Sequence, residues 1–332
     1  MRKLAITMGD PAGVGPEIIV KAIDSPGVRK CCIPIVIGDP SVMEKALALL
    51  KRPLKLRIID SPKDSKPAKG IIEVIGNSFS SSAGKGGMVG FERNRPTSAG
   101  GRAAADYIRR AVELALSGQV NGIVTAPISK EALKMAGLRW PGHTEMLADL
   151  THTRDYAMML VGGPLCIILV TIHTALRNVP DLITKQKIVR TIRLAKKACD
   201  MLGIKRPRIA VAGLNPHAGE RGIFGDEEII KIVPAVKESI KGGISVSGPY
   251  PPDTIFHKAY SGEVDIIVCM YHDQGLIPLK MIAFERGVNV TVGLPFIRTS
   301  PDHGTAYDIA WKGIADPSSM IEAIKLAAKF KI

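Results

Sequence analysis

Aromatic residues are scarce in this sequence. Phe, Trp and Tyr make up 5% of its 332 residues. A protein face that binds nucleic acid usually combines clustered basic residues with aromatic side chains that stack on bases. Lys and Arg are scattered along this chain, and they outnumber Asp and Glu by 45 to 31, which gives a net charge of +14. This charge favours small anionic metabolites as ligands, and no nucleic-acid partner is expected.

Cysteine is scarce as well. The five cysteines are odd in number and form no CxxC motif, and Cys166 and Cys269 lie inside apolar runs. Reduced, buried cysteines of a cytoplasmic protein are therefore expected, with no disulfide framework. The apolar stretch near the amino terminus is also too short to predict a secretory signal.

No apolar run is long enough to predict a membrane span. The longest tract, AMMLVGGPLCIILVTI at residues 157–172, is interrupted by Gly162, Gly163 and Pro164. Each half has the length of a strand, so the tract predicts a buried hairpin or strand pair.

The common nucleotide-binding patterns are missing too. The stretch MGDPAGVGPE at residues 8–17 lacks the lysine and hydroxyl of a Walker motif, and its GVGPEI is not the dinucleotide-binding GxGxxG. Taken alone, it predicts only a sharp turn from a strand into a helix.

Apolar strands and helices alternate along the chain. The patterns predict strands at 3–8, 32–39, 121–127, 208–215, 264–270 and 288–295, and helices at about 99–117, 129–137, 184–202 and 318–330. Such alternation, with continuously apolar strands, is typical of α/β proteins whose parallel sheets are covered on both faces. The length favours two domains. The polar segments 61–70 and 76–101 are candidates for a loop or lid.

Three histidines come just after apolar strands. His173 follows LCIILVTI, His217 follows RIAVAGLNP and His272 follows VDIIVCMY. Ligands of open α/β sheets bind at the carboxyl ends of the strands. Three imidazoles that meet there would suit a divalent metal with an open position. The alternative is three unrelated turn histidines, and the recurrence of the pattern favours the metal.

Each of two aspartates near these histidines has two alternative roles. Asp253, in GPYPPDT, is either a carboxylate that supports a metal ligand or a helix cap. Asp273 directly follows His272, and either orients its ring or shapes the turn.

Several other residues are candidates for binding an anion. His143 and Thr144, in WPGHTEML, stand at a predicted helix start, where backbone N–H groups favour an anion; simple capping by Thr144 is the alternative. Lys280, Asn289 and Arg298 lie near strands or turns of the last third, and together they could grip a phosphate or carboxylate.

Six blocks of the sequence resemble the 4-hydroxythreonine-4-phosphate dehydrogenase family of pyridoxal phosphate biosynthesis: MGDPAGVGPEI, TAPISK, GHTE, NPHAGE, MYHDQGLIPLK and VNVTVGLPFIRTSPDHGTA. GDPAGVGPEI and HGTAYDIAWKGIADP are also similar, more distantly, to segments of isopropylmalate and isocitrate dehydrogenases. The resemblance implies two α/β/α three-layer domains of that fold, with the active site in the interdomain cleft. We expect a first domain on the cofactor side at 1–125 with about 281–332, and a second on the metal and dimer side at about 126–280.

The same resemblance implies roles for individual residues. The family's metal ligands, through which catalysis would run, fall on His173, His217 and His272. Its substrate contacts fall on His143, Thr144, Lys280, Asn289 and Arg298. Through the more distant likeness, NAD contacts fall on His303, Gly304, Thr305, Ala306 and Asp308. It also implies a homodimer whose shared active site has histidines from both chains, with NAD or NADP as cofactor and Zn²⁺, Mg²⁺ or Co²⁺ as metal.

The implied reaction is oxidation of 4-phosphooxy-L-threonine at the C3 hydroxyl to 2-amino-3-oxo-4-phosphooxybutanoate. This product decarboxylates to 3-amino-2-oxopropyl phosphate, a precursor of pyridoxine 5′-phosphate. Two alternatives stay open. D-Threonate or D-erythronate 4-phosphate would be oxidised by the same mechanism. A metal-dependent phosphoester hydrolase would use the same histidines, although the HGTAYDIA block argues for a dinucleotide site.

Overall fold

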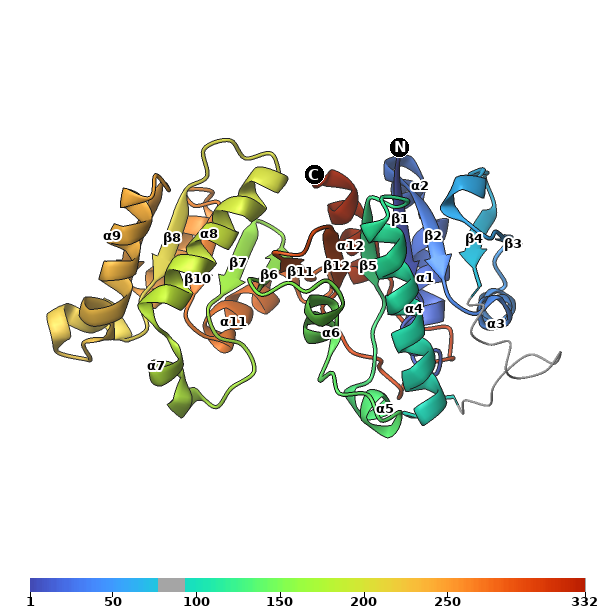
Figure 1. The fold of residues 1–332 in the computed structure, drawn as a ribbon, viewed down its shortest axis with the longest axis horizontal. Coiled ribbons are helices and arrows are strands. Elements are labelled where there is room, and N and C mark those ends of the chain that lie inside the picture. Colours follow the sequence, from blue (N-terminus) through green and yellow to red (C-terminus); the bar gives the residue numbers. More distant parts are fainter. Residues whose placement is uncertain (77–92, 332) are drawn as a thin grey trace. The chain divides into compact units, whose positions relative to one another are not determined.

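The computed structural model describes residues 1–76 and 93–331, which form two compact units (Figure 1). Unit 1 comprises Met1–Arg154 and Leu294–Lys329, and unit 2 comprises Asp155–Gly293 and Phe330–Ile332. Most of the lid candidate at 76–101 lies outside the described residues.

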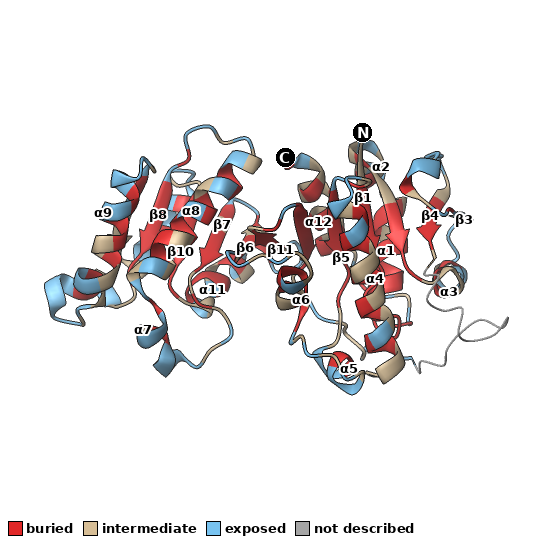
Figure 2. Ribbon diagram, in the orientation of Figure 1, coloured by how far each residue is buried: buried red, intermediate tan, exposed pale blue. Residues whose placement is uncertain are grey.

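Unit 1 contains a parallel sheet with the strand order β3-β4-β2-β1-β5-β12. Its strands are β1 (Arg2–Thr7), β2 (Cys32–Ile37), β3 (Lys55–Ile58), β4 (Ile71–Ile75), β5 (Gly122–Thr125) and β12 (Ile297–Pro301). Leu4 and Ile6 of β1 are fully buried, as are Ile35 of β2 and Val124 of β5. The continuous apolar runs therefore fill the core, and the red strands of Figure 2 lie beneath helices with one buried face.

The helices of unit 1 are α1 (Gly15–Asp24), α2 (Pro26–Cys31), α3 (Pro40–Leu50), α4 (Ser98–Leu116), α5 (Lys130–Met135), α6 (His143–Leu150) and α12 (Ser318–Lys329), with a 3-10 turn η1 (Pro62–Asp64). Thr97 caps α4, and its hydroxyl accepts the Gly100 N–H at 3.0 Å. Ser98 also suits a cap by residue type, but Thr97 has the extended backbone that a cap requires.

Unit 2 contains a mixed sheet with the strand order β11-β6-β7-β10-β8-β9. Its strands are β6 (Ala157–Gly162), β7 (Leu165–Leu169), β8 (Ile209–Ala212), β9 (Val246–Tyr250), β10 (Ile266–Cys269) and β11 (Val288–Val292). β6 runs antiparallel to both β7 and β11, and the other pairs are parallel. The predicted hairpin at 157–172 is confirmed. Because the two residues between β6 and β7 are too few for a crossover, this part of the sheet departs from the expected parallel order.

The helices of unit 2 are α7 (Val179–Leu182), α8 (Lys185–Met201), α9 (Val233–Lys241), α10 (Pro252–Tyr260) and α11 (His272–Ala283), with short turns η3 (Leu176–Asn178), η4 (Pro216–Gly222) and η5 (Glu228–Ile232). No helix in the described parts of the chain is long and apolar enough to cross a membrane. The α/β class predicted from the sequence is confirmed in both units.

The bounds of the two units differ from those of the expected domains. Residues 126–154 pack in unit 1, where α5 lies against α4, although we expected them in the second domain. Residues 281–293 pack in unit 2, because β11 pairs with β6 along its whole length. Strand pairing and helix packing thus decide where each unit ends.

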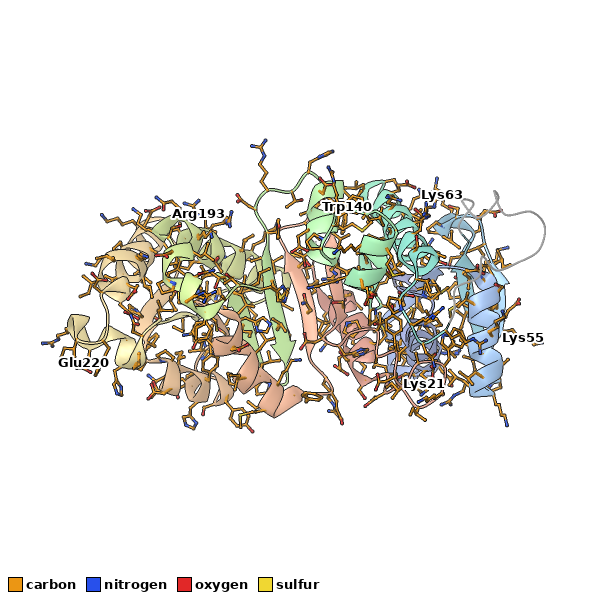
Figure 3. The ribbon with its side chains drawn as sticks, turned by 90° about the horizontal axis from the view of Figure 1, so that it is seen from below. Lys21, Lys55, Lys63, Trp140, Arg193 and Glu220 are labelled. Carbon is orange, nitrogen blue, oxygen red and sulfur yellow. The ribbon has the colours of Figure 1, made fainter. Side chains whose placement is uncertain are left out.

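Basic side chains project from many elements of both units. Figure 3 labels Lys21 on α1, Lys55 on β3 and Lys63 on η1 in unit 1, and Arg193 on α8 in unit 2. The positive charge of the chain is therefore spread over several elements.

Candidate active-site residues of the two units

Two of the three predicted metal ligands lie side by side in unit 2. His173 follows β7 and His272 opens α11 directly after β10, and β7 and β10 are parallel neighbours. Their ring centroids lie 5.5 Å apart, with the ring planes tilted by 44°. His173 is exposed, and the side chain of His272 is 33% exposed. The two imidazoles are therefore close to each other and accessible to a ligand at the carboxyl edge of this sheet.

His217 occupies an exposed turn in the same unit. Residues His217 to Arg221 all have positive φ angles, and the His217 ring centroid lies 6.1 Å from that of Phe224. Within residues 1–76 and 93–331, no group of three or more His, Cys, Asp or Glu side chains is positioned to hold a metal ion. One chain thus brings together His173 and His272, and it presents His217 on a separate turn.

A buried glutamate holds the turn that carries His217. Glu228 Oε1 accepts the backbone N–H groups of Leu214 at 2.7 Å and Asn215 at 2.8 Å. Its Oε2 accepts the Asn215 amide at 3.0 Å. A side chain at Gly219, which has φ +81°, would meet Glu228 Oε2 at 2.7 Å. The NPHAGE motif therefore forms a left-handed turn. Glu228 holds it, together with Glu227, which accepts the Asn215 side-chain amide at 2.6 Å.

The two residues after His272 have different contacts, because Asp273 touches its ring and Gln274 bonds to the backbone at the ends of two strands. Asp273 Oδ1 lies 2.7 Å from His272 Nδ1, so Nε2 is the ring nitrogen that this carboxylate does not engage. Gln274 accepts the Met270 N–H and donates to Gly213 O, both at 2.7 Å, so it ties the end of β10 to the end of β8. A carboxylate on the far nitrogen is the usual support of a histidine that ligates a metal. Of the two roles considered for Asp273, the geometry fits the orienting one.

The other candidates in unit 2 occupy α10, α11 and β11. Asp253 is exposed in the first turn of α10, where a negative charge favours the helix. Lys280 lies on α11 with its Nζ atom 5.6 Å from the Phe284 ring centroid. Asn289 lies on β11, and its buried Oδ1 has no hydrogen-bond partner among the described residues. A buried acceptor is costly when left unpaired, so this oxygen is available to a hydrogen-bond donor.

In unit 1, a buried arginine forms the centre of the candidate anion site. Arg298 on β12 is 2% exposed, and its Nε and Nη2 atoms donate to Thr125 Oγ1 at 3.2 and 2.7 Å. Burial lowers the pKa of Arg298, and the nearby Glu145 carboxylate opposes this shift. A guanidinium stays charged at neutral pH, so the site contains a buried positive charge.

His143 lies beside this charge at the start of α6. Its buried Nε2 has no hydrogen-bond partner in the described part of the chain. Burial, and then the charge of Arg298, hold the pKa of His143 well below its usual value, so its ring is neutral at neutral pH. Gly142 is the N-cap residue, which leaves the buried Thr144 in the first turn without the capping role considered for it. A neutral imidazole, helix N–H groups and a guanidinium together suit an anionic ligand.

The predicted cofactor segment, residues 303–308, is hydrogen-bonded to the glycine-rich turn after β1. Val14 N–H donates to Thr305 O at 3.0 Å, and the Tyr307 hydroxyl donates to Asp10 Oδ2 at 2.7 Å. A side chain at Gly13 would meet Thr305 O at 2.9 Å, so only glycine allows this approach. Burial raises the pKa of Asp10, although the hydrogen bonds from Tyr307 and the Ala12 N–H oppose it.

Helix α1 holds the rest of this segment. Lys21 Nζ donates to Gly313 O at 2.8 Å and to Ala315 O at 2.6 Å. Glu17 is fully buried and accepts the Trp311 N–H, and its Oε2 has no partner among the described residues. The MGDPAGVGPE motif near the start of the sequence and the HGTAYDIAWKGIADP segment near its end are thus held together by hydrogen bonds in unit 1.

The predicted cofactor residues lie on this fastened segment. His303, Gly304 and Asp308 are exposed, and Thr305 and Ala306 are half-buried. Asp10, Glu17 and Tyr307, which hold the segment, were not among the residues predicted from the sequence. The available signal was the presence of two acidic residues, at 10 and 17, in an otherwise apolar strand–turn–helix unit.

The structure therefore defines an α/β protein with two neighbouring histidines, one of them in contact with a carboxylate, in one unit. The other unit has a buried arginine close to a histidine, which is a candidate anion site. The chain belongs to the pyridoxal phosphate biosynthetic protein PdxA family, whose model matches residues 30–327. This match confirms the resemblance carried by the six sequence blocks.

Individual relatives are similar over nearly the whole chain. A 4-hydroxythreonine-4-phosphate dehydrogenase from Desulforapulum autotrophicum is 50% identical over 326 residues, which cover 98% of this chain and 94% of the relative. A D-threonate 4-phosphate dehydrogenase from Salmonella typhimurium is 47% identical, with 98% of each chain covered. The crystal structure of 4-hydroxythreonine-4-phosphate dehydrogenase from Klebsiella pneumoniae has a TM-score of 0.89 at 46% identity, with 98% of each chain covered.

Proposed function

We propose that this protein is an NAD-dependent and metal-dependent 4-hydroxythreonine-4-phosphate dehydrogenase. It would oxidise the C3 hydroxyl of 4-phosphooxy-L-threonine and pass the hydride to NAD, giving the 3-oxo acid that decarboxylates to 3-amino-2-oxopropyl phosphate. Membership of the PdxA family and the relative at 50% identity support this reaction. The observation that carries it is the pair of accessible histidines, His173 and His272, with Asp273 on the second ring.

The donor set of unit 2 fits a divalent metal. We assign metal binding to His173, His217 and His272, and imidazole nitrogens suit Zn²⁺ or Co²⁺ better than Mg²⁺. The metal, when bound, would supply the Lewis acidity that lowers the pKa of the C3 hydroxyl. Because one chain brings only two of the histidines together, we propose that His217 completes the site from a second copy of the chain.

The candidate anion-binding residues would bind the charged ends of the substrate. We assign contacts with its phosphate and carboxylate to Arg298, His143 and Thr144 of unit 1 and to Lys280 of unit 2. The unpaired Oδ1 of Asn289 would accept a hydrogen bond from the substrate ammonium group. The segment with His303, Gly304, Thr305, Ala306 and Asp308 would hold the cofactor, NAD or NADP.

A homodimer is part of the proposal, and helix α11 supports it. Ile277 and Met281 of this helix and Phe284, its C-cap residue, recur at helical spacing, and their exposures are 59%, 83% and 75%. Such a row of large apolar side chains is uncommon on the free surface of a monomer. A second copy of the chain that covers this row would lie next to His272, the first residue of the same helix.

We also propose that the protein works in the cytoplasm. The five cysteines are free thiols in the described structure, and Cys32, Cys199 and Cys269 are buried. Thiols that stay reduced suit a reducing compartment.

A second candidate substrate is D-threonate 4-phosphate, because a relative with that activity in its name is 47% identical to this chain. The deciding experiment compares NAD reduction with 4-phosphooxy-L-threonine and with D-threonate 4-phosphate, in the presence of Zn²⁺, Co²⁺ or Mg²⁺. We expect turnover of the first substrate. Turnover of only the second would replace the proposed substrate, and phosphate release without NAD would indicate a phosphoester hydrolase.

A further inference from the structure

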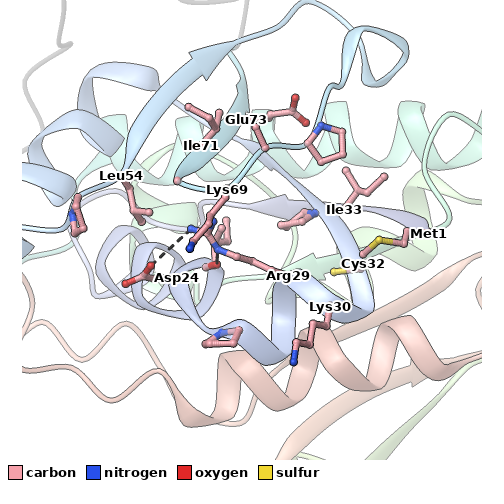
Figure 4. Close-up of a pocket in the computed structure, with 17 residues that line it drawn as sticks. Met1, Asp24, Arg29, Lys30, Cys32, Ile33, Leu54, Lys69, Ile71 and Glu73 are labelled. Carbon is pink, nitrogen blue, oxygen red and sulfur yellow. Dashed lines mark hydrogen bonds and ion pairs between the residues drawn. The ribbon is translucent and has the colours of Figure 1, made fainter.

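A cavity of about 640 Å³ opens in unit 1, and none of the residues assigned above to the metal, the substrate or the cofactor lines it (Figure 4). This volume lies within the usual range of small-molecule sites. The floor is apolar and includes Ile33 of β2, Leu54 before β3 and Ile71 of β4. The end of α1, the helix α2 and the turn at 67–70 supply the rest of the wall.

The charges that line this cavity are unbalanced. The two acidic residues are already paired, Asp24 with Arg29 at 3.6 Å and with Arg52 at 3.3 Å, and Glu73 with Arg57. Lys30 and Lys69 also line the cavity, and neither has an acidic partner in the described part of the chain. The wall therefore combines an apolar floor with ammonium groups that are free to pair with an anion.

The cavity lies toward the amino ends of the strands of unit 1, whereas the proposed active-site residues of this unit lie toward the carboxyl ends. Several of its lining residues precede or open strands, as Met1 does for β1 and Gly70 does for β4. Asp10 and Thr125 instead stand at the carboxyl ends of β1 and β5. Because these strands are parallel, the two sets of residues are separated by the length of the sheet. A ligand in the cavity would not overlap the candidate anion and cofactor residues.

We propose that this cavity binds a small amphipathic anion, with an aliphatic body on the floor and one carboxylate or phosphate group at Lys69. The apolar floor supplies the affinity for the body, and the free ammonium groups select an anionic head over a neutral one. This site is independent of the dehydrogenase reaction proposed above.

The test measures binding of octanoate, octyl phosphate and octanol to the whole protein by titration calorimetry. We expect both anions to bind and octanol to bind more weakly. The Lys69→Gln variant should weaken anion binding about two- to fivefold, as expected for one partly exposed ion pair, and leave octanol unchanged. The matched control is Lys63→Gln, which removes an exposed charge of the same unit outside the cavity and should change nothing.

A second variant tests the location without removing a charge. Ala68 is exposed in the turn before β4, and Ala68→Trp would place an indole in the cavity. We expect this variant to unfold at the same denaturant concentration as the natural protein and to lose binding of all three compounds. The better-bound anion identifies the head group as carboxylate or phosphate. Unchanged binding in Ala68→Trp, binding of octanol as tight as that of the anions, or no binding of either anion would overturn the proposal.

Discussion

Tyr307 and Asp10 are joined by a hydrogen bond of 2.7 Å, although they are 297 residues apart in the sequence. The bond fixes the proposed cofactor segment to the turn after β1. It also opposes the effect of burial, which raises the pKa of Asp10. This hydrogen bond thus links the glycine-rich turn after β1 to the HGTAYDIA segment.

Replacing Tyr307 with phenylalanine removes only this hydroxyl. We expect the free energy of unfolding to fall by about 1 to 2 kcal/mol, because a buried carboxyl loses its donor. The KM for NAD should rise more than kcat falls, since the segment would be held less firmly. Urea unfolding and steady-state kinetics measure the two effects. The control is Tyr260→Phe, at an exposed tyrosine of α10, and an equal effect there would contradict this role for Tyr307.

Replacing Asp273 with asparagine keeps the shape of the side chain but removes its charge. We expect metal affinity to fall by about ten- to a hundredfold, as is usual when a carboxylate that supports a histidine ligand is lost. A titration of apoprotein with Zn²⁺ or Co²⁺ gives the affinity directly. The matched control is Asp253→Asn, at an exposed carboxylate of the same unit. If that variant were the one to lose metal, Asp253 would be the supporting carboxylate.

Replacing His272 with alanine should abolish metal-dependent NAD reduction while the protein stays folded, because the ring is one-third exposed and contributes little to the core. Activity with added metal, circular dichroism and metal content are the measurements. The His257→Ala variant, at an exposed histidine of α10, should keep full activity. Full activity of His272→Ala would remove this residue from the proposed metal site.

His143, with its buried Nε2 atom, predicts a pH dependence of stability. Its pKa is well below the usual value in the folded state, so near pH 6.5 the unfolded chain takes up a proton that the folded chain does not. Stability from this group is therefore present above that pH, and it is lost as the pH falls, by at most about 1.4 kcal/mol per pH unit.

The His143→Gln variant should reduce this acid sensitivity, which urea unfolding at about pH 5 and about pH 8 would reveal. The His257→Gln variant, at an exposed histidine, should keep the natural pH dependence. An identical loss of stability in His143→Gln and the natural protein would mean that other groups cause it.

The apolar row on α11 predicts self-association. We expect Met281→Glu to convert a dimer into a monomer, because a charge replaces the most exposed apolar side chain of the row. Sedimentation velocity measures the mass. The control is Met135→Glu, at an exposed methionine of α5 in unit 1, which should remain dimeric. A natural protein that sediments as a monomer would contradict the proposed dimer.

Elements with continuous apolar runs could be predicted from the sequence, and others could not. β1 and β10 are buried on both faces, so their composition alone reveals them. β3 has the sequence KLRI, lies at the edge of the sheet and is largely uncovered, so it has no apolar signature. α11 was also missed, because Gly275 and Pro278 weaken its helical pattern.

By itself, the sequence determined the alternation of strands and helices, the hairpin at 157–172 and the family, because each depends on residues that are close together in the chain. Only the tertiary structure decided that His173 and His272 lie 5.5 Å apart while His217 stands on its own turn. It also decided that Asp10 meets Tyr307, and that burial and then the charge of Arg298 depress the pKa of His143. Distances between side chains from remote segments depend on strand order and burial, and no local pattern of residues encodes either one.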